Sequence, residues 1–262
     1  MKGIVIGTSF GGVEPATGLP SLSYTGDMIF TPDENGEDWE AVLTSSGNLS
    51  FSALGNAAAG IEVFMVGGGG SGGYGGSNLY WACGGCGGHV DYFEYTPVKE
   101  TPYTINIGAG GTAGTTPAAG GDTTAFGHTA AGGSPGGNTN EAGNGHTSAA
   151  GTGGSGGGGW KGNGGSNGSN GTGYNAGTGD GLSCYLYRDS STGELFSGGG
   201  AGGLGGPSAL SPGDGGGGVA NGGAGEDGRG GGGGGSWNNT SAGGSGGSGV
   251  IYMRNKRTVI SE

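Results

Sequence analysis

The chain has 262 residues, of which 79 are glycine, and its formal net charge at pH 7 is −12. This acidic balance argues against a protein that binds nucleic acid, because such proteins present a basic surface to the phosphate backbone. No stretch approaches the roughly 20 apolar residues of a membrane-spanning helix, so we do not expect insertion into a membrane.

Residues 1–23 show no regular pattern, and we interpret them as an irregular segment that attaches the chain to a larger assembly. Their first part, MKGIVIGTSFGG, lacks the apolar core of a secretory signal. The next residues are rich in β-branched and aromatic side chains, as half-buried strands are. We therefore predict a β-scaffold over residues 24–66, with strands in YTGDMIF (24–30), DWEAVLTS (38–45) and NLSFSAL (48–54).

The glycines are unevenly distributed. The first 66 residues hold ten of the 79 glycines and none follows residue 249, so we assign residues 67–249 to a glycine-rich domain. Composition alone would indicate disorder or a flexible spacer. Strand-like runs at its borders and within it argue for order, as do large apolar residues such as Leu204. The runs are IEVFMVG (61–67), YTINIGAG (103–110) and GVIYMR (249–254).

Many glycines recur with a period of three, in GGX repeats at 69–77, 84–89, 198–207 and 243–249. Polyproline II geometry has three residues per turn and a rise of about 3.1 Å per residue. Glycine helices of this geometry can lie side by side and pair their main-chain N–H and C=O groups with those of their neighbours. Collagen does not fit, because the chain has only nine prolines.

The fold class that we expect is mainly β plus a polyglycine II helix bundle. In this arrangement a small antiparallel β-scaffold carries a glycine-rich slab, with almost no α-helix, and residues 250–262 form a closing strand and a C-terminal tail. The slab needs the scaffold, because glycine offers little apolar area to bury.

Six stretches, taken in order, carry a family resemblance. They are YTGDMIF (24–30), WEAVLTSSGNLSF (39–51), IEVFMVGGGGSGG (61–73), YTINIGAGGTAG (103–114), GGDTTAFGHTAAGG (120–133) and GGSGVIYMR (246–254). This succession resembles the glycine-rich domain of phage and prophage tail-fibre and minor structural proteins. The order of the stretches is specific to that pattern, whereas a single glycine run is not.

The resemblance implies a non-enzymatic virion protein, assembled in the cytoplasm of a host bacterium. It implies a tail-fibre adhesin that recognises a glycan or protein of the host surface through loops at the ends of the bundle. At the level of the bundle the chain is also similar to the distal tail-fibre adhesins of T-even-like phages. It departs from them in the N-terminal region, so their mode of attachment does not transfer. Other virion proteins are expected partners, and a homo-oligomer such as a trimer would be common for a fibre.

Two other functions remain open. The same domain could serve as a virion decoration or head-fibre protein, with stability rather than recognition as its role. It could also be an extracellular domain that binds a protein ligand, since the bundle is similar to the glycine-rich domain of anaplastic lymphoma kinase. The chain differs from that receptor in lacking a signal peptide and a disulfide framework.

Three cysteines, an odd number, do not form a disulfide scaffold. Cys83 and Cys86 in CGGC would lie about 9 Å apart on one face of a glycine helix. A disulfide requires Cα atoms within about 7 Å, and no second CxxC completes a zinc site, although His89 is a further candidate ligand. We therefore interpret these cysteines as structural or incidental, and we expect no metal.

No catalytic motif is recognisable. The glycine runs contain no GK[ST] for phosphate binding and the chain has no HExxH. Acidic pairs such as Glu226 and Asp227 are typical of solvated turns. We therefore expect no enzyme activity and no cofactor.

Recognition should lie in loops, because the slab buries mainly backbone. LSCYLYRDSSTGELF (182–196) interrupts the glycines, and aromatic rings beside Asn or Arg suit sugar faces or a protein epitope. The candidate receptor-binding residues are Tyr185, Tyr187, Arg188, Trp160, Trp237 and Asn238. The alternative is that such rings close the ends of glycine helices or cover the scaffold. For Tyr92, Phe93 and Tyr95, which precede Pro97 in an expected strand, we favour the alternative.

Overall fold

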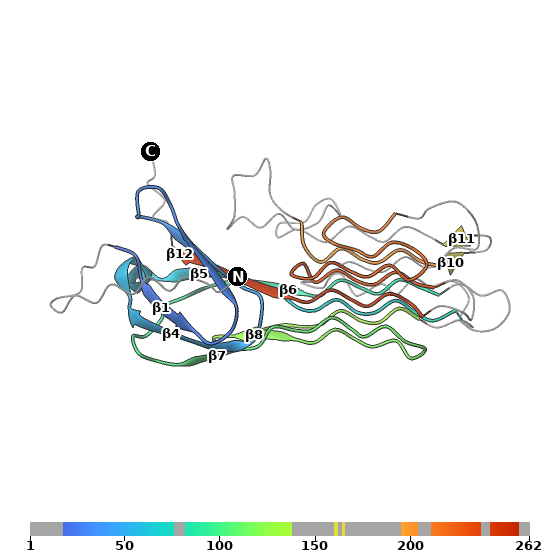
Figure 1. Ribbon diagram of the computed structural model, residues 1–262, viewed down its shortest axis with the longest axis horizontal. Coiled ribbons are helices and arrows are strands. Elements are labelled where there is room, and N and C mark those ends of the chain that lie inside the picture. Colours follow the sequence, from blue (N-terminus) through green and yellow to red (C-terminus); the bar gives the residue numbers. More distant parts are fainter. Residues whose placement is uncertain are drawn as a thin grey trace.

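The computed structural model describes residues 18–75, 82–137, 195–203, 211–236 and 242–256, and the backbone of two short strands within 160–165. Figure 1 shows two parts along the long axis, with β-sheets at one end and extended tracts running away from them. In the described residues the only helical element is the 3₁₀ helix η1 (Gly55–Ala59). The prediction of a mainly β protein with almost no helix is therefore confirmed.

The larger sheet is antiparallel and has five strands in the order β2-β3-β12-β5-β6. These are β2 (Met28–Pro32), β3 (Trp39–Leu43), β12 (Val250–Asn255), β5 (Ile61–Val66) and β6 (Val90–Tyr95). Val66 is paired with Val250, so the chain leaves the sheet and returns to it on neighbouring strands. Both ends of the glycine-rich residues are thus held at one place.

The smaller sheet has the order β1-β4-β7, from β1 (Ser21–Tyr24), β4 (Gly47–Ala53) and β7 (Tyr103–Ile105). A bridge between Asn106 and Thr124 connects it to the hairpin of β8 (Thr123–Ala125) and β9 (His128–Ala130). A further pair, β10 (Trp160–Lys161) and β11 (Gly164–Gly165), lies apart from both sheets (Figure 1). β1 begins at Ser21, within the segment expected to be irregular.

The main core lies between the two sheets, because alternate residues of each strand point to the same face. On β3, Trp39, Ala41 and Leu43 are buried and the two residues between them are only partly so. They share one apolar cluster with residues of β4 and β5, such as Phe51 and Val63. The sequence pattern of strands with one buried face thus gives a sandwich.

The outer face of the five-stranded sheet carries a second, smaller cluster. Phe196 packs on Phe64 and Tyr252, with ring centroids 5.3 and 5.4 Å apart. Arg229 lies over the Phe196 ring at 5.8 Å and donates to the carbonyl of Leu195 at 2.8 Å. These contacts attach the glycine-rich part to the sheet.

β6 confirms the strand expected around Tyr92, Phe93 and Tyr95. Phe93 and Tyr95 pack against the main core, and Tyr92 packs against the outer cluster. These rings therefore cover the scaffold.

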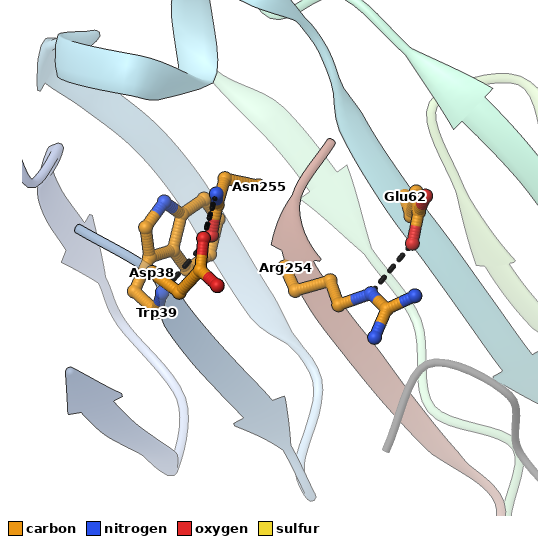
Figure 2. Close-up of polar contacts among 5 residues, drawn as sticks. All are labelled: Asp38, Trp39, Glu62, Arg254 and Asn255. Atoms are coloured by element: carbon orange, nitrogen blue, oxygen red, sulfur yellow. Dashed lines mark hydrogen bonds and ion pairs between the residues drawn. The ribbon is translucent and has the colours of Figure 1, made fainter. Parts of the chain in front are cut away.

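Polar side chains hold the end of β12 to the strands on both sides (Figure 2). Arg254 donates through Nε to Glu62 of β5 at 2.5 Å, and only 15% and 11% of the two side chains are exposed. On the other side, Asn255 accepts from the Trp39 amide at 3.0 Å and donates to Asp38 at 2.7 Å. The closing strand is thus positioned by specific polar contacts as well as by apolar packing.

We expect Glu62→Gln to lower the free energy of unfolding by roughly 2–3 kcal/mol, because it leaves the Arg254 guanidinium buried without its carboxylate partner. The exposed pair of Lys256 and Glu94, 2.6 Å apart, provides the control. Lys256→Gln should leave stability essentially unchanged, since exposed ion pairs contribute little. Urea denaturation of the three proteins tests this, and equal midpoints for both variants would refute it.

Tyr24 gives a pH-dependent prediction. Its hydroxyl donates to the Ser45 carbonyl, and burial, with a smaller effect of the Asp27 charge, raises its pKa from 10.0 to about 12. The folded state therefore keeps this proton where the unfolded state loses it, so the stability it contributes is present below pH 10 and is lost as the pH rises towards 12. Tyr24→Phe should show a shallower loss of stability over this range. Identical profiles for the two proteins in denaturant titrations would contradict this.

Candidate functional site: the far end of the glycine tracts

Residues 67–75, here called the central tract, leave the sheet at β5, and Gly67 to Gly73 are all buried. Their N–H groups bond to three neighbouring tracts in rotation, so every third N–H meets the same neighbour. Gly67, Gly70 and Gly73 donate to residues 82–89, Gly68 and Ser71 donate to residues 118–121, and Gly69 and Gly72 donate to residues 243–249, all at 2.8–2.9 Å.

The carbonyl groups of the central tract accept hydrogen bonds from three further tracts. Gly133 and Gly136 donate to Gly68 and Ser71, Gly233 and Ser236 donate to Gly70 and Gly73, and Gly111 donates to Gly69. The central tract therefore bonds to neighbours on all sides, whereas a β-strand bonds only within one sheet. These bonds satisfy main-chain groups that burial would otherwise leave unpaired.

Glycine is required where the tracts approach one another. A Cβ atom placed on Gly69, Gly70 or Gly72 would lie 2.0–2.1 Å from a carbonyl oxygen of a neighbouring tract. Ser71 is accommodated between them, and its Oγ accepts a hydrogen bond from Ala118 at 2.8 Å. The two bare positions of each GGX repeat thus face other main chains.

The tracts end together on the side remote from the sheets, here called the far end. Ser236 is fully buried there and bonds to two other segments, the central tract and residues 82–89. Its N–H donates to Gly73 at 3.1 Å, its carbonyl accepts from Ala82 at 3.0 Å, and its Oγ accepts from Gly75 at 2.7 Å. Gly75 and Ser236, where two described stretches of the chain end, therefore lie next to each other.

The candidate receptor-binding residues fall largely outside the described residues: Tyr185, Tyr187, Arg188, Trp237 and Asn238. Trp237 and Asn238 directly follow Ser236, so they are attached to the far end by chain connectivity. Trp160 begins β10, where it pairs with Gly165, and Figure 1 places this pair at the far end. The position of its side chain is outside the description.

The segment that carries Tyr185 and Arg188 returns to the described structure at Leu195. The next residue, Phe196, ends the stretch 182–196, for which the sequence left both packing and recognition open; it is buried against the sheet with 1% of its surface exposed. The sequence of this aromatic-rich stretch does not distinguish a side chain that packs against the sheet from one that binds a ligand. The described structure thus attaches this stretch to the sheet, away from Ser236.

A turn at the far end escaped the sequence analysis. Val219 is 57% exposed, Asn221 donates through its N–H to Gly235 at 2.8 Å, and Gly223 donates to Val219 at 3.0 Å. Asn221 and Gly222 have φ angles of 63° and 90°, which Asn-Gly pairs adopt readily. The Asn-Gly dipeptide was therefore an available sequence signal for this turn.

The two cysteines of CGGC lie on residues 82–89, facing residues 131–137. The N–H groups of Cys83, Cys86 and His89 donate to Gly137, Ser134 and Ala131 at 3.2, 2.9 and 2.8 Å. Cys86 is buried and Cys83 is partly buried. In the ranges described above, no group of three or more His, Cys, Asp or Glu side chains could hold a metal ion.

The far end, as far as the structure describes it, is therefore made of main chain bonded to main chain. A search of the described residues for a helix long and apolar enough to cross a membrane found none.

Comparison with known proteins gives one family. A model described as a glycine-rich domain matches residues 44–256, which include most strands of both sheets and all the tracts described above. A search of curated proteins gave no match to the chain.

The close approach of the tracts gives a stability prediction. Gly72→Ala would place a methyl group 2.0 Å from the Gly234 carbonyl oxygen. We expect it to lower the free energy of unfolding by about 3 kcal/mol or more, because both tracts would have to move apart.

Gly114→Ala is the matched control, since the nearest heavy atoms to its Cβ would lie 3.8 Å away. It should leave stability unchanged or raise it slightly, because alanine restricts the unfolded chain. Thermal and urea unfolding measure both variants. Similar losses at the two positions would show that close approach is not what requires glycine.

Proposed function

The chain belongs to the glycine-rich domain family, and from the resemblance of its six ordered stretches to tail-fibre proteins we propose that it is a non-enzymatic phage virion protein. In this proposal it is a tail-fibre or receptor-binding component, and loops at the far end of its glycine tracts contact the host surface. The observation that carries the proposal is the convergence at Ser236, which joins the points where two aromatic-containing segments leave the tracts.

The glycine tracts are, in this proposal, polyglycine II helices. The support is the rotation of hydrogen bonds in the central tract, where every third N–H bonds to the same neighbour. This matches the three residues per turn of that geometry. Six tracts also surround the central one, and at Gly69, Gly70 and Gly72 they lie too close for any side chain.

Such a bundle suits recognition at its ends. Its interior consists of main chain bonded to main chain, so it offers few side chains to a ligand along its length. It is held to the sheets by β5 and β12 and therefore positions its far end rigidly. Loops supported on a rigid framework are where binding residues are commonly found.

Trp237 and Asn238 are the first candidates for contact, since they directly follow Ser236. An indole ring beside an amide suits the apolar face and hydroxyl groups of a sugar, or an epitope on a surface protein. Trp160 is a second candidate at the same end. Tyr185, Tyr187 and Arg188 remain candidates, but Phe196 attaches their segment to the sheet.

The proposed compartment is the virion, after assembly in the bacterial cytoplasm. Nucleic acid is not among the proposed partners, because the net charge of −12 would repel its phosphate backbone.

The test is adsorption of particles carrying the protein to their host cells. We expect Trp237→Ala combined with Asn238→Ala to slow adsorption at least about tenfold, as loss of a binding hot spot does. Lys256→Ala, an exposed change at the sheet end, is the control and should adsorb normally. Both variants should unfold at the wild-type temperature.

Cryo-EM of the same particles provides the second measurement. The proposal expects density for the protein at the tip of the tail, with the far end pointing outwards. Normal adsorption of variants at all six candidate positions, together with density on the head, would replace the receptor-binding role with a decoration role.

A further inference from the structure

β2 forms one edge of the five-stranded sheet, and in the described part of the chain its only neighbour is β3. Two hydrogen bonds show which groups face that neighbour. Thr44 donates to Asp27 at 3.2 Å and Asp33 donates to Asp38 at 2.8 Å, so both pairs are of the hydrogen-bonded kind. Such pairs alternate along an antiparallel ladder. The N–H and C=O groups of Met28 and Phe30 therefore point away from β3.

Pro32 is the next residue that faces outwards. It offers a carbonyl but no N–H group. The open edge thus has two donors and three acceptors, enough to pair with a short extended segment. Proline at this position also limits how far such a segment can be paired.

Ile29 gives the edge an exposed apolar side chain, with 63% of its surface accessible. Strand register places it beside Val42, which is beside Tyr252, which is beside Phe64. Tyr252 and Phe64 belong to the cluster on the outer face of the sheet, and Val42 packs against it. Ile29 is therefore the exposed end of an apolar row that a further strand would extend.

The ends of β2 are acidic. Exposed Asp27 precedes the strand, and exposed Asp33, Glu34 and Glu37 follow it. A second copy of the chain, paired antiparallel about Phe30, would bring Asp27 of one copy against Asp33 of the other. Like charges directly opposite each other destabilise strand pairs. A strand with basic ends would instead be attracted at both ends.

We propose that the edge of β2 is a second binding site, which takes an extended segment of another protein as a sixth strand. The segment would be apolar at its centre, to contact Ile29, and would carry lysine or arginine at its ends, to pair with Asp27 and Asp33. This is strand addition, in which main-chain hydrogen bonds give affinity and side-chain contacts give specificity. The site lies in the sheets, so it would connect the chain to its assembly and leave the far end free (Figure 1).

The test uses the full chain and a labelled heptapeptide with Val-Ile-Val at its centre and lysine at both ends. Fluorescence anisotropy should show saturable binding. Replacing the terminal lysines of the peptide with glutamates should raise the dissociation constant roughly two- to fivefold or more, because exposed ion pairs contribute about that much to affinity. A peptide N-methylated on the amides of one edge should not bind.

Ile29→Lys should weaken binding about fivefold or more, because it removes the apolar contact and adds a repelling charge. Val98→Lys is the matched control, since Val98 is 58% exposed and lies on the loop between β6 and β7. It should bind the peptide as the wild type does. Unchanged unfolding temperatures would show that both variants fold.

Three outcomes would overturn the proposal. Equal peptide binding by wild type and Ile29→Lys would remove the site, and binding that survives N-methylation would exclude strand addition. Concentration-dependent self-association that Ile29→Lys abolishes would assign the edge to a second copy of the chain. None of these outcomes bears on adsorption through Trp237, so the test is independent of the proposed receptor role.

Discussion

Contact between main chains without intervening side chains is the constraint on which the rest of the structure depends. In the central tract the N–H groups of residues 67–73 and the carbonyl groups of five of these residues bond to other tracts, and carbonyl oxygens lie where a Cβ atom would be. Buried peptide groups without partners would cost more free energy than the domain could recover from its few apolar residues. The glycines are thus needed for packing as well as for chain flexibility.

The β-sandwich makes this arrangement possible. β5 and β12 lie side by side, so the glycine-rich residues begin at Val66 and end at Val250, a directly paired position. Apolar cores supply the stability that glycine cannot, and Arg254 and Asn255 fix β12 against both neighbours. The two parts therefore have separate roles: the sheets stabilise and connect, and the tracts position their far end.

Strands were predictable where side chains differ in polarity. IEVFMVG, YTINIGAG and GVIYMR each contain a strand of the structure, because β-branched and aromatic residues were the signal. The β8–β9 hairpin was missed, since its turn places Phe126 at φ 52°, and phenylalanine is an unusual residue there. The packing of Phe196 on the sheet could not be predicted, because aromatic residues among glycines have the same sequence pattern whether they pack or bind.

The sequence by itself determined the presence of strands, the extent of the glycine-rich part and its three-residue period, because these depend on local composition. Which tract lies beside which was decided only by the tertiary structure: Gly72 bonds to Gly244 and Gly73 to Cys83, although nothing in glycine distinguishes one partner from another. The convergence at Ser236 and the open edge of β2 have the same origin. Glycine tracts have no side chains that could specify a partner, so the connections to the sheets and the pairing of main-chain groups select the arrangement.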